Sequence, residues 1–124
     1  MQSEILDRHK NADLQVFAIW FQMYPTDQRS AWPEDLLTDD RIAHFWDDGK
    51  VVGTWYAQQL DAMRPRLVPD ATGLDQPVPV LWDSWIVYSP DARWEAFPTG
   101  LQTWGRTILN TRPQFTEAAE RLFR

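Results

Sequence analysis

Two apolar runs along the chain have the pattern of buried β-strands. The first, DLQVFAIWFQMYP from Asp13 to Pro25, is almost continuously apolar, is rich in β-branched and aromatic residues, and ends at a proline. Such a run is typical of a strand in a parallel sheet that helices cover on both faces. The second run, DSWIVYS, leads into a Ser-Pro-Asp turn. We therefore predict strands over residues 14–22 and 83–89.

Shorter patterns predict two further strands. In RIAHFWDDGK, the positions alternate until the turn residues Asp48 and Gly49, which predicts a strand over residues 41–46. The short turn after residue 89 predicts an antiparallel partner strand over residues 92–97. Together these segments predict a mixed sheet of about four strands.

A helical spacing of apolar residues appears in three segments. Residues 3–11, 51–63 and 113–123 each place apolar side chains on one face of a helix. Gly53 weakens the second of these helices by about 1 kcal/mol relative to alanine, but it would let another segment pack closely. A further short helix is predicted to begin near Pro33.

The order of these elements predicts the fold class. Helix, strand, helix, strand, helix, hairpin, helix is expected of an α/β layer fold with flanking helices. Residues 64–79 hold four of the nine prolines and form a loop that is long for a compact domain, which suggests a functional or mobile segment. Residues 97–113 show no clear pattern. With a length of 124 residues, the chain 1–124 is predicted to be a single domain.

Composition narrows the chemistry. There is no cysteine, which excludes disulfides, zinc–thiolate sites and thiol catalysis within these residues. The two histidines, His9 and His44, are too few for most histidine-based metal sites. Hydrophobic residues make up 44% of the chain, so a folded core is expected. We therefore expect no cofactor and no metal. The sequence shows no recognisable set of catalytic residues, which argues against an enzyme but does not exclude one.

The acidic charge limits the classes of partner. Eighteen acidic residues against twelve basic ones give a formal net charge of −6 and a pI near 4.7. Long-range repulsion then opposes binding to nucleic acid and to anionic membranes. The N-terminal residues lack the pattern of a signal peptide, and no apolar run approaches the roughly 18 residues of a membrane span. A cytoplasmic location is the default expectation.

Two longer motifs resemble parts of the thioredoxin-like superfamily. HFWDDGKVVGTWYA is similar to a strand, turn and helix in the branch that includes peroxiredoxins and the tethered thioredoxins of cytochrome maturation, and DSWIVYSPDARW is similar to the strand, turn and strand that follow there. AIWFQMYPTD, RIAHFWD, Gly53 and WDSWIVYSPDARW resemble a group of uncharacterised bacterial thioredoxin-like proteins over residues 3–95. The resemblance implies a thioredoxin-like fold and transfers no function.

The resemblance also implies what these residues lack. Redox members of the superfamily carry a Cys-x-x-Cys between a central strand and the first long helix, and Met1 aligns inside that helix. The chain would then be an N-terminally truncated thioredoxin-like domain. Either it is a fragment of a thiol-disulfide oxidoreductase whose preceding segment carried the cysteines, or it is a cysteine-free, degenerate descendant.

On this resemblance, the strands over residues 14–22 and 83–89 would flank the missing central strand. Native sheets avoid open apolar edges of that kind. The two strands are therefore expected either to pair directly or to be covered by a partner chain. The second arrangement predicts a homo-oligomer, most simply a dimer.

Asp83 is the first candidate site residue, because its carboxylate follows Trp82 within an apolar strand. Buried there, it would have a raised pKa and could act as an acid, a base or a ligand anchor. It could equally accept hydrogen bonds from backbone N–H groups or from tryptophan indoles, which only donate. His44, near Asp47 and Asp48, is either a metal ligand or general base, or a half-buried ring with ordinary partners.

The tryptophans are candidates both for the core and for a ligand pocket. We place Trp20, Trp46 and Trp85 in the core, and Trp82 and Trp104 nearer a cleft. Arg93 could pair with a cleft carboxylate or an acidic ligand, or it could form a surface salt bridge.

These features predict a non-redox module that binds a small molecule or a protein. The expected cleft is bordered by Tyr24, Trp82, Asp83 and the segment 64–79, and its ligand would be small and apolar or aromatic. The candidate ligand-binding residues are Trp82, Asp83, Tyr24, His44, Trp104 and Arg93. A fragment of a thiol-disulfide oxidoreductase is the alternative function, and an enzyme that uses the Asp83 carboxylate ranks last.

Overall fold

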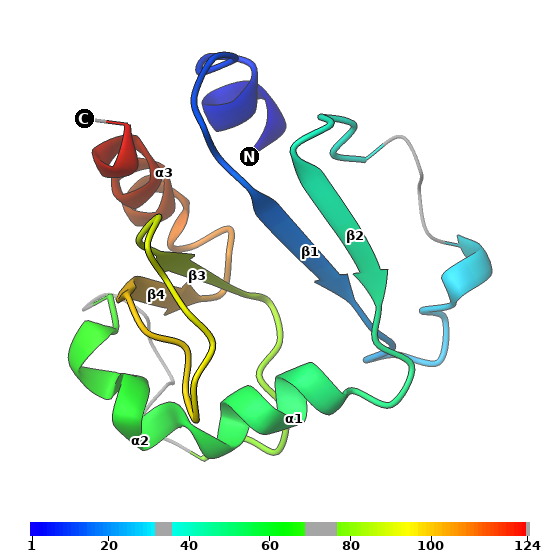
Figure 1. The fold of residues 1–124 in the computed structure, drawn as a ribbon. Coiled ribbons are helices and arrows are strands. Elements are labelled where there is room, and N and C mark those ends of the chain that lie inside the picture. The colour runs from blue at the N-terminus through cyan, green and yellow to red at the C-terminus, as the bar shows by residue number, and fades with distance from the viewer. Residues whose placement is uncertain (32–35, 69–76, 124) are drawn as a thin grey trace.

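Helices and strands alternate along the chain (Figure 1). The computed structural model describes residues 1–31, 36–68 and 77–123. Its strands are β1 (Val16–Trp20), β2 (Ile42–Trp46), β3 (Ser84–Tyr88) and β4 (Leu101–Arg106). Its helices are η1 (Gln2–Leu6), η2 (Arg29–Ala31), α1 (Val51–Gln58), α2 (Leu60–Met63), η3 (Arg64–Arg66) and α3 (Arg112–Leu122). The α/β class predicted from the sequence is confirmed.

β1 and β2 form a parallel two-stranded sheet, in the segments that the hydrophobic pattern predicts. The prediction that both faces of β1 are covered is wrong. Phe17 is 65% exposed and stacks on Phe45 of β2, which is 50% exposed, with ring centroids 6.4 Å apart. One face of this sheet therefore carries exposed aromatic rings.

β3 and β4 form an antiparallel two-stranded sheet. β3 lies where the second apolar run predicts it, but the partner strand predicted over residues 92–97 is wrong. Pro98 has no N–H to donate to a strand ladder, and Gly100 has a φ of +75°, so the partner strand begins only after these residues. The N–H of Ser89 then donates to the carbonyl oxygen of Gly100 (2.8 Å) and closes the loop. The partner strand is β4, in a segment that showed no clear pattern.

The two sheets are separate. The described residues contain the expected number of strands, but β1 and β3 are not hydrogen-bonded to each other. The predicted single mixed sheet and the direct pairing of these two strands are therefore not formed within the described part of the chain.

The predicted helices are present with altered lengths. The helix predicted over residues 51–63 is interrupted at Gln59, where φ is −100° and ψ is 3°, so it becomes α1 and α2. Asp47 caps α1, because its carboxylate accepts the N–H groups of Val51 (2.9 Å) and Val52 (2.8 Å). α3 matches the helix predicted over residues 113–123.

The N-terminal helix predicted over residues 3–11 is shorter than expected. η1 is a π-helical segment of five residues, and it buries Ile5 and Leu6. The helix predicted near Pro33 starts outside the described residues, which also omit residues 69–76 of the predicted long loop. None of the helices in the described ranges combines the length and the apolar character that crossing a bilayer requires.

The guanidinium of Arg41 connects η1 with the start of β2. It donates to the carbonyl oxygens of His9 (2.7 Å) and Leu6 (2.9 Å), and it forms a two-pronged ion pair with Asp39 at 2.8 Å. Hydrogen bonds from Arg41 lower the pKa of Asp39 to about 2. The carbonyl groups at the end of η1 are therefore satisfied by a charged side chain of the first sheet.

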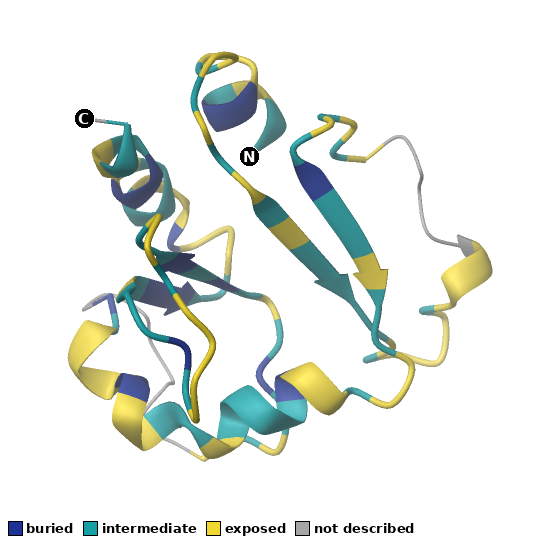
Figure 2. Cartoon of the chain, viewed as in Figure 1, coloured by how far each residue is buried: buried dark blue, intermediate teal, exposed yellow. Residues whose placement is uncertain are grey.

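Two clusters of buried residues lie on the β3–β4 half of the molecule, whereas Ile5 and Leu6 of η1 and Ile42 of β2 are buried outside them (Figure 2). One cluster joins Met63 of α2 with Leu81 and Trp104. The other joins Val68, Trp85, Val87 and Ala118 of α3. Because neighbouring strand residues face opposite sides, α2 covers one face of β3–β4 and α3 covers the other. Neither cluster of buried residues includes a member of β1 or β2.

Candidate functional site

A cleft of about 460 Å³ opens between the end of β1 and the start of β3. Ile19, Trp20 and Phe21 line one side, and Trp82, Asp83 and Ser84 line the other. Residues of the loop 23–28, together with Trp46 and Ile108, complete the lining. The lining is mainly aromatic and aliphatic, and its charged groups are the carboxylates of Asp27 and Asp83.

Tyr24 and Trp82 meet at this cleft. Their ring centroids are 5.9 Å apart with an interplanar angle of 84°, which is the favourable edge-to-face arrangement. Asp27 fixes the loop that carries Tyr24, because its Oδ2 accepts the N–H groups of Met23 (3.0 Å) and Tyr24 (2.8 Å). The Tyr24 side chain is 58% exposed. These two candidate residues therefore form a partly open aromatic pair.

Asp83 lines the cleft, but the prediction that it is buried is wrong. The residue is exposed and has a φ of +49°, a left-handed conformation that aspartate tolerates better than most side chains. Its carbonyl oxygen accepts the N–H of Thr107 (2.7 Å), and its Oδ1 accepts the N–H of Ile108 (3.2 Å). The carboxylate thus acts as a backbone acceptor, one of the two roles expected for it.

His44 supports the cleft wall through Trp20. The indole N–H of Trp20 donates to His44 Nδ1 (3.0 Å), and His44 Nε2 lies 3.0 Å from the carbonyl oxygen of Leu37. Because the indole only donates, Nδ1 is an acceptor, and Nε2–H donates to Leu37. Both ring nitrogens are engaged, so His44 has the ordinary role of a half-buried ring.

The tryptophans are distributed differently from the prediction. Trp85 is buried in the core as expected. Trp20 and Trp46 are only partly buried and line the cleft, so their assignment to the core is wrong. Trp104 was expected near a cleft, but it is 2% exposed and its indole N–H donates to the carbonyl oxygen of Met63 (2.8 Å). Trp104 is a core residue.

Arg93 does not join the cleft. It is exposed in the loop between β3 and β4, where its backbone N–H donates to Thr99 Oγ1 (2.8 Å). The described residues of the segment 64–79 do not line the cleft either. The structure therefore brings together three of the six candidate residues: Tyr24, Trp82 and Asp83.

Sequence reasoning missed several cleft residues. Phe21 lies within the first predicted strand but follows the observed β1, and Asp27 lies in the loop after it. The turn residues after Tyr24 are the signal that could have placed Asp27 there. Ile108 lies beyond β4, in a segment without a readable pattern. Its position depends on contacts that only the folded chain shows.

The described residues contain no group of three or more His, Cys, Asp or Glu side chains placed to bind a metal ion. Asp47, which could have joined His44 in such a site, uses both carboxylate oxygens to cap α1. The described cleft therefore offers aromatic surfaces and two carboxylates, which can bind a ligand without a metal.

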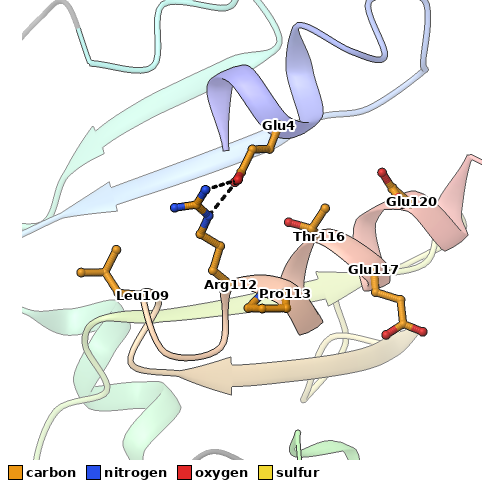
Figure 3. A pocket seen from close by; sticks show the side chains of 7 residues that line it. All are labelled: Glu4, Leu109, Arg112, Pro113, Thr116, Glu117 and Glu120. Atoms are coloured by element: carbon orange, nitrogen blue, oxygen red, sulfur yellow. Dashed lines mark hydrogen bonds and ion pairs between the residues drawn. The ribbon is translucent and has the colours of Figure 1, made fainter.

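A second hollow, of about 590 Å³, lies between η1 and α3 (Figure 3). Arg112 reaches across it and donates to Glu4 through Nε (2.8 Å) and through Nη2. These hydrogen bonds lower the pKa of the Glu4 carboxyl group. Glu117 and Glu120 also line the hollow, and Glu120 lies near Arg8 (3.8 Å). Its charges are largely paired within the chain, so it is the weaker candidate.

Comparisons with protein-family models, curated proteins and solved structures gave no match. The functional argument therefore depends on the cleft itself. Its distinguishing feature is the aromatic pair of Tyr24 and Trp82, which come from two segments far apart in sequence and belong to a mainly apolar lining.

Proposed function

We propose that the protein is a non-redox binding module that holds a small apolar or aromatic group in the cleft between β1 and β3. The group belongs either to a small molecule or to a partner protein. The edge-to-face pair of Tyr24 and Trp82 carries this proposal, because partly exposed rings at a cleft mouth provide apolar contact area at low entropic cost. Mainly apolar lining with a few polar groups is typical of ligand sites.

We also propose that the two sheets are parts of a thioredoxin-like fold. The parallel pair β1–β2, the connection through α1 and α2, the antiparallel pair β3–β4 and the closing helix α3 follow the order expected from the sequence motifs. A homodimer remains a further proposal, supported by the exposed stack of Phe17 on Phe45. Sedimentation velocity tests it.

Binding of Nile red, a neutral apolar dye, tests the function. We expect its fluorescence to rise on binding, and Trp82→Ala to weaken the affinity by about two- to tenfold, the equivalent of one aromatic contact. The dye should also quench the fluorescence of tryptophans at the cleft.

Trp94→Ala is the matched control. Trp94 is 71% exposed and packs near Trp55, with ring centroids 5.3 Å apart, outside the cleft lining. This substitution removes an exposed indole without altering the cleft, so dye affinity should not change. Equal loss in both variants, or no dye binding to the unaltered protein, would contradict the proposed function.

A further inference from the structure

One edge of β1 pairs with no strand of the described residues, and we call such an edge free. The N–H of Val16 donates to the carbonyl oxygen of Arg41 (2.9 Å), and the carbonyl oxygen of Trp20 accepts the N–H of Asp47 (2.7 Å). In a parallel ladder, alternate residues direct both backbone groups to the same neighbour. Residues 16, 18 and 20 therefore face β2, while Phe17 and Ile19 direct their N–H and C=O groups to the opposite edge. No described strand pairs with that edge.

β3 has a similar free edge. The N–H of Thr107 donates to the carbonyl oxygen of Asp83 (2.7 Å), which sets the alternation of the antiparallel ladder with β4. Trp85 and Val87 then bond to β4, while Ser84 and Ile86 direct their backbone groups away from it. Within the described ranges, no strand pairs with this edge of β3.

The two free edges meet at the cleft. Ile19 from the open edge of β1 and Ser84 from the open edge of β3 both line it. Figure 1 shows β1 and β3 as the inner strands of their sheets, running in roughly opposite directions. Each edge presents N–H groups that need acceptors and C=O groups that need donors. An extended peptide has both N–H and C=O groups along each of its two sides, so it can pair with both edges.

We propose that an extended segment of a partner protein inserts between β1 and β3 and joins the two sheets into one. Because β1 and β3 run in opposite directions, the segment lies parallel to one and antiparallel to the other. This proposal rests on the proposed function, since a side chain of the inserted segment occupies the cleft. Strand addition of this kind obtains affinity from main-chain hydrogen bonds and specificity from side-chain pockets.

The strands of a second copy do not fit this position. Each of the strands seen in the described residues already has a strand partner along one edge. Insertion requires a segment with both edges free, so a described strand of a second copy would first have to leave its own sheet. A dimer formed through Phe17 and Phe45 would use the face of β1–β2 and would leave the edge open.

Charge defines the chemistry of the segment. Asp27 and Asp83 line the cleft, its described lining includes no basic side chain, and the whole chain carries a formal charge of −6. A lysine or arginine next to an apolar side chain therefore complements the cleft. Proline is excluded from the paired positions, because it has no N–H to donate.

Three synthetic peptides of about seven residues, a common strand length, test the proposal. The first alternates valine and threonine and carries one lysine. The second has the same sequence with N-methyl groups on alternate backbone nitrogens, so it cannot donate to one of the two edges. The third replaces the lysine with glutamate. Calorimetry gives the affinities, and hydrogen exchange followed by NMR gives the protection of each amide.

We expect the first peptide to bind and to slow exchange at Phe17, Ile19, Ser84 and Ile86. The methylated and acidic peptides should each bind about tenfold more weakly or worse, through lost hydrogen bonds and lost charge complementarity. Equal binding of all three peptides, or binding without protection of these amides, would overturn the proposal. Protection in the protein alone that rises with its concentration would assign the edges to a second copy and would also overturn it.

Nile red separates this proposal from the proposed function. Dye binding that depends on Trp82, with no peptide binding, would overturn strand insertion and leave the cleft as a ligand site. Loss of both would overturn both proposals. Competition between the first peptide and the dye is the result expected if the two share the cleft.

Discussion

At the scale of single residues, the hydroxyl of Thr111 is the acceptor on which a buried tryptophan depends. Thr111 is 1% exposed, and the indole N–H of Trp85 donates to its Oγ1 (2.8 Å). The hydroxyl itself can donate to the carbonyl oxygens of Thr107 (3.1 Å) or Arg106 (3.2 Å). Since an indole only donates, Trp85 is satisfied by this one side chain.

Thr111→Val should lower the free energy of unfolding by about 1–3 kcal/mol, because it keeps the shape of the side chain and leaves a buried N–H without an acceptor. Urea unfolding followed by tryptophan fluorescence measures the change. Thr111→Ser is the control, since it keeps the hydroxyl and loses one methyl group. A valine variant as stable as the serine variant would show that the Trp85 hydrogen bond adds nothing.

The sequence placed Tyr24 and Trp82 at a cleft because each lies near the end of a predicted strand, and both line the cleft in the structure. Their rings meet there. The burial of Asp83 was predicted wrongly, because the residue precedes β3 and has a positive φ, and the sign of φ cannot be read from the hydrophobic pattern. Trp104 was misjudged because periodicity does not distinguish an inward tryptophan from one at a cleft.

At the scale of elements, Gly53 sets how closely α1 approaches the segment before β3. A Cβ at this position would lie 2.8 Å from both the carbonyl oxygen of Leu81 and Val80 Cγ1. The carbonyl oxygen of Gly53 also accepts the N–H of Leu81 (2.9 Å). The sequence predicted that this glycine would permit close packing, and the structure identifies the segment that packs there.

Gly53→Ala should destabilise the protein by up to about 2 kcal/mol, because an overpacking cost of roughly 1–3 kcal/mol is offset by a helix preference of about 1 kcal/mol for alanine over glycine. Chemical denaturation gives the free energy of unfolding. Gly49→Ala is the matched control, because its Cβ would lie at an ordinary distance of 3.4 Å from Val51 Cγ2. Stabilisation by Gly53→Ala would mean that α1 can move away from Leu81 without cost.

Periodicity predicts the elements whose apolar and polar residues are spaced regularly within the segment itself. β1, β2, β3 and α3 fall in this group. β4 was not predictable, because Gly105 interrupts its pattern and is required by a distant contact: a Cβ there would lie 2.6 Å from Trp85 Cζ2. The separation into two sheets could not be predicted from the sequence either, since it depends on which strand edges lie next to each other in the folded chain.

At the scale of the whole molecule, the two sheets are supported unequally. β3–β4 lies between α2 and α3 and is packed against both core clusters, whereas β1–β2 exposes Phe17 and Phe45 on one face. A hydrogen bond from Arg41 connects the β1–β2 sheet with η1, and the Arg112–Glu4 ion pair connects η1 with α3. Apolar burial is the larger source of stability, so the two sheets should open with different free energies.

Hydrogen exchange of the protein without added peptide tests this inequality. Amide protons in the hydrogen bonds between β1 and β2 should exchange before those in the hydrogen bonds between β3 and β4. The reason is that opening the first sheet exposes less buried apolar surface. NMR resolves the two groups of amides in one sample. A single rate for both sheets, equal to that of global unfolding, would show that they open as one unit. If the sheets open separately, a peptide inserted between β1 and β3 should bring their exchange rates together, because β1 then opens only when the peptide is released.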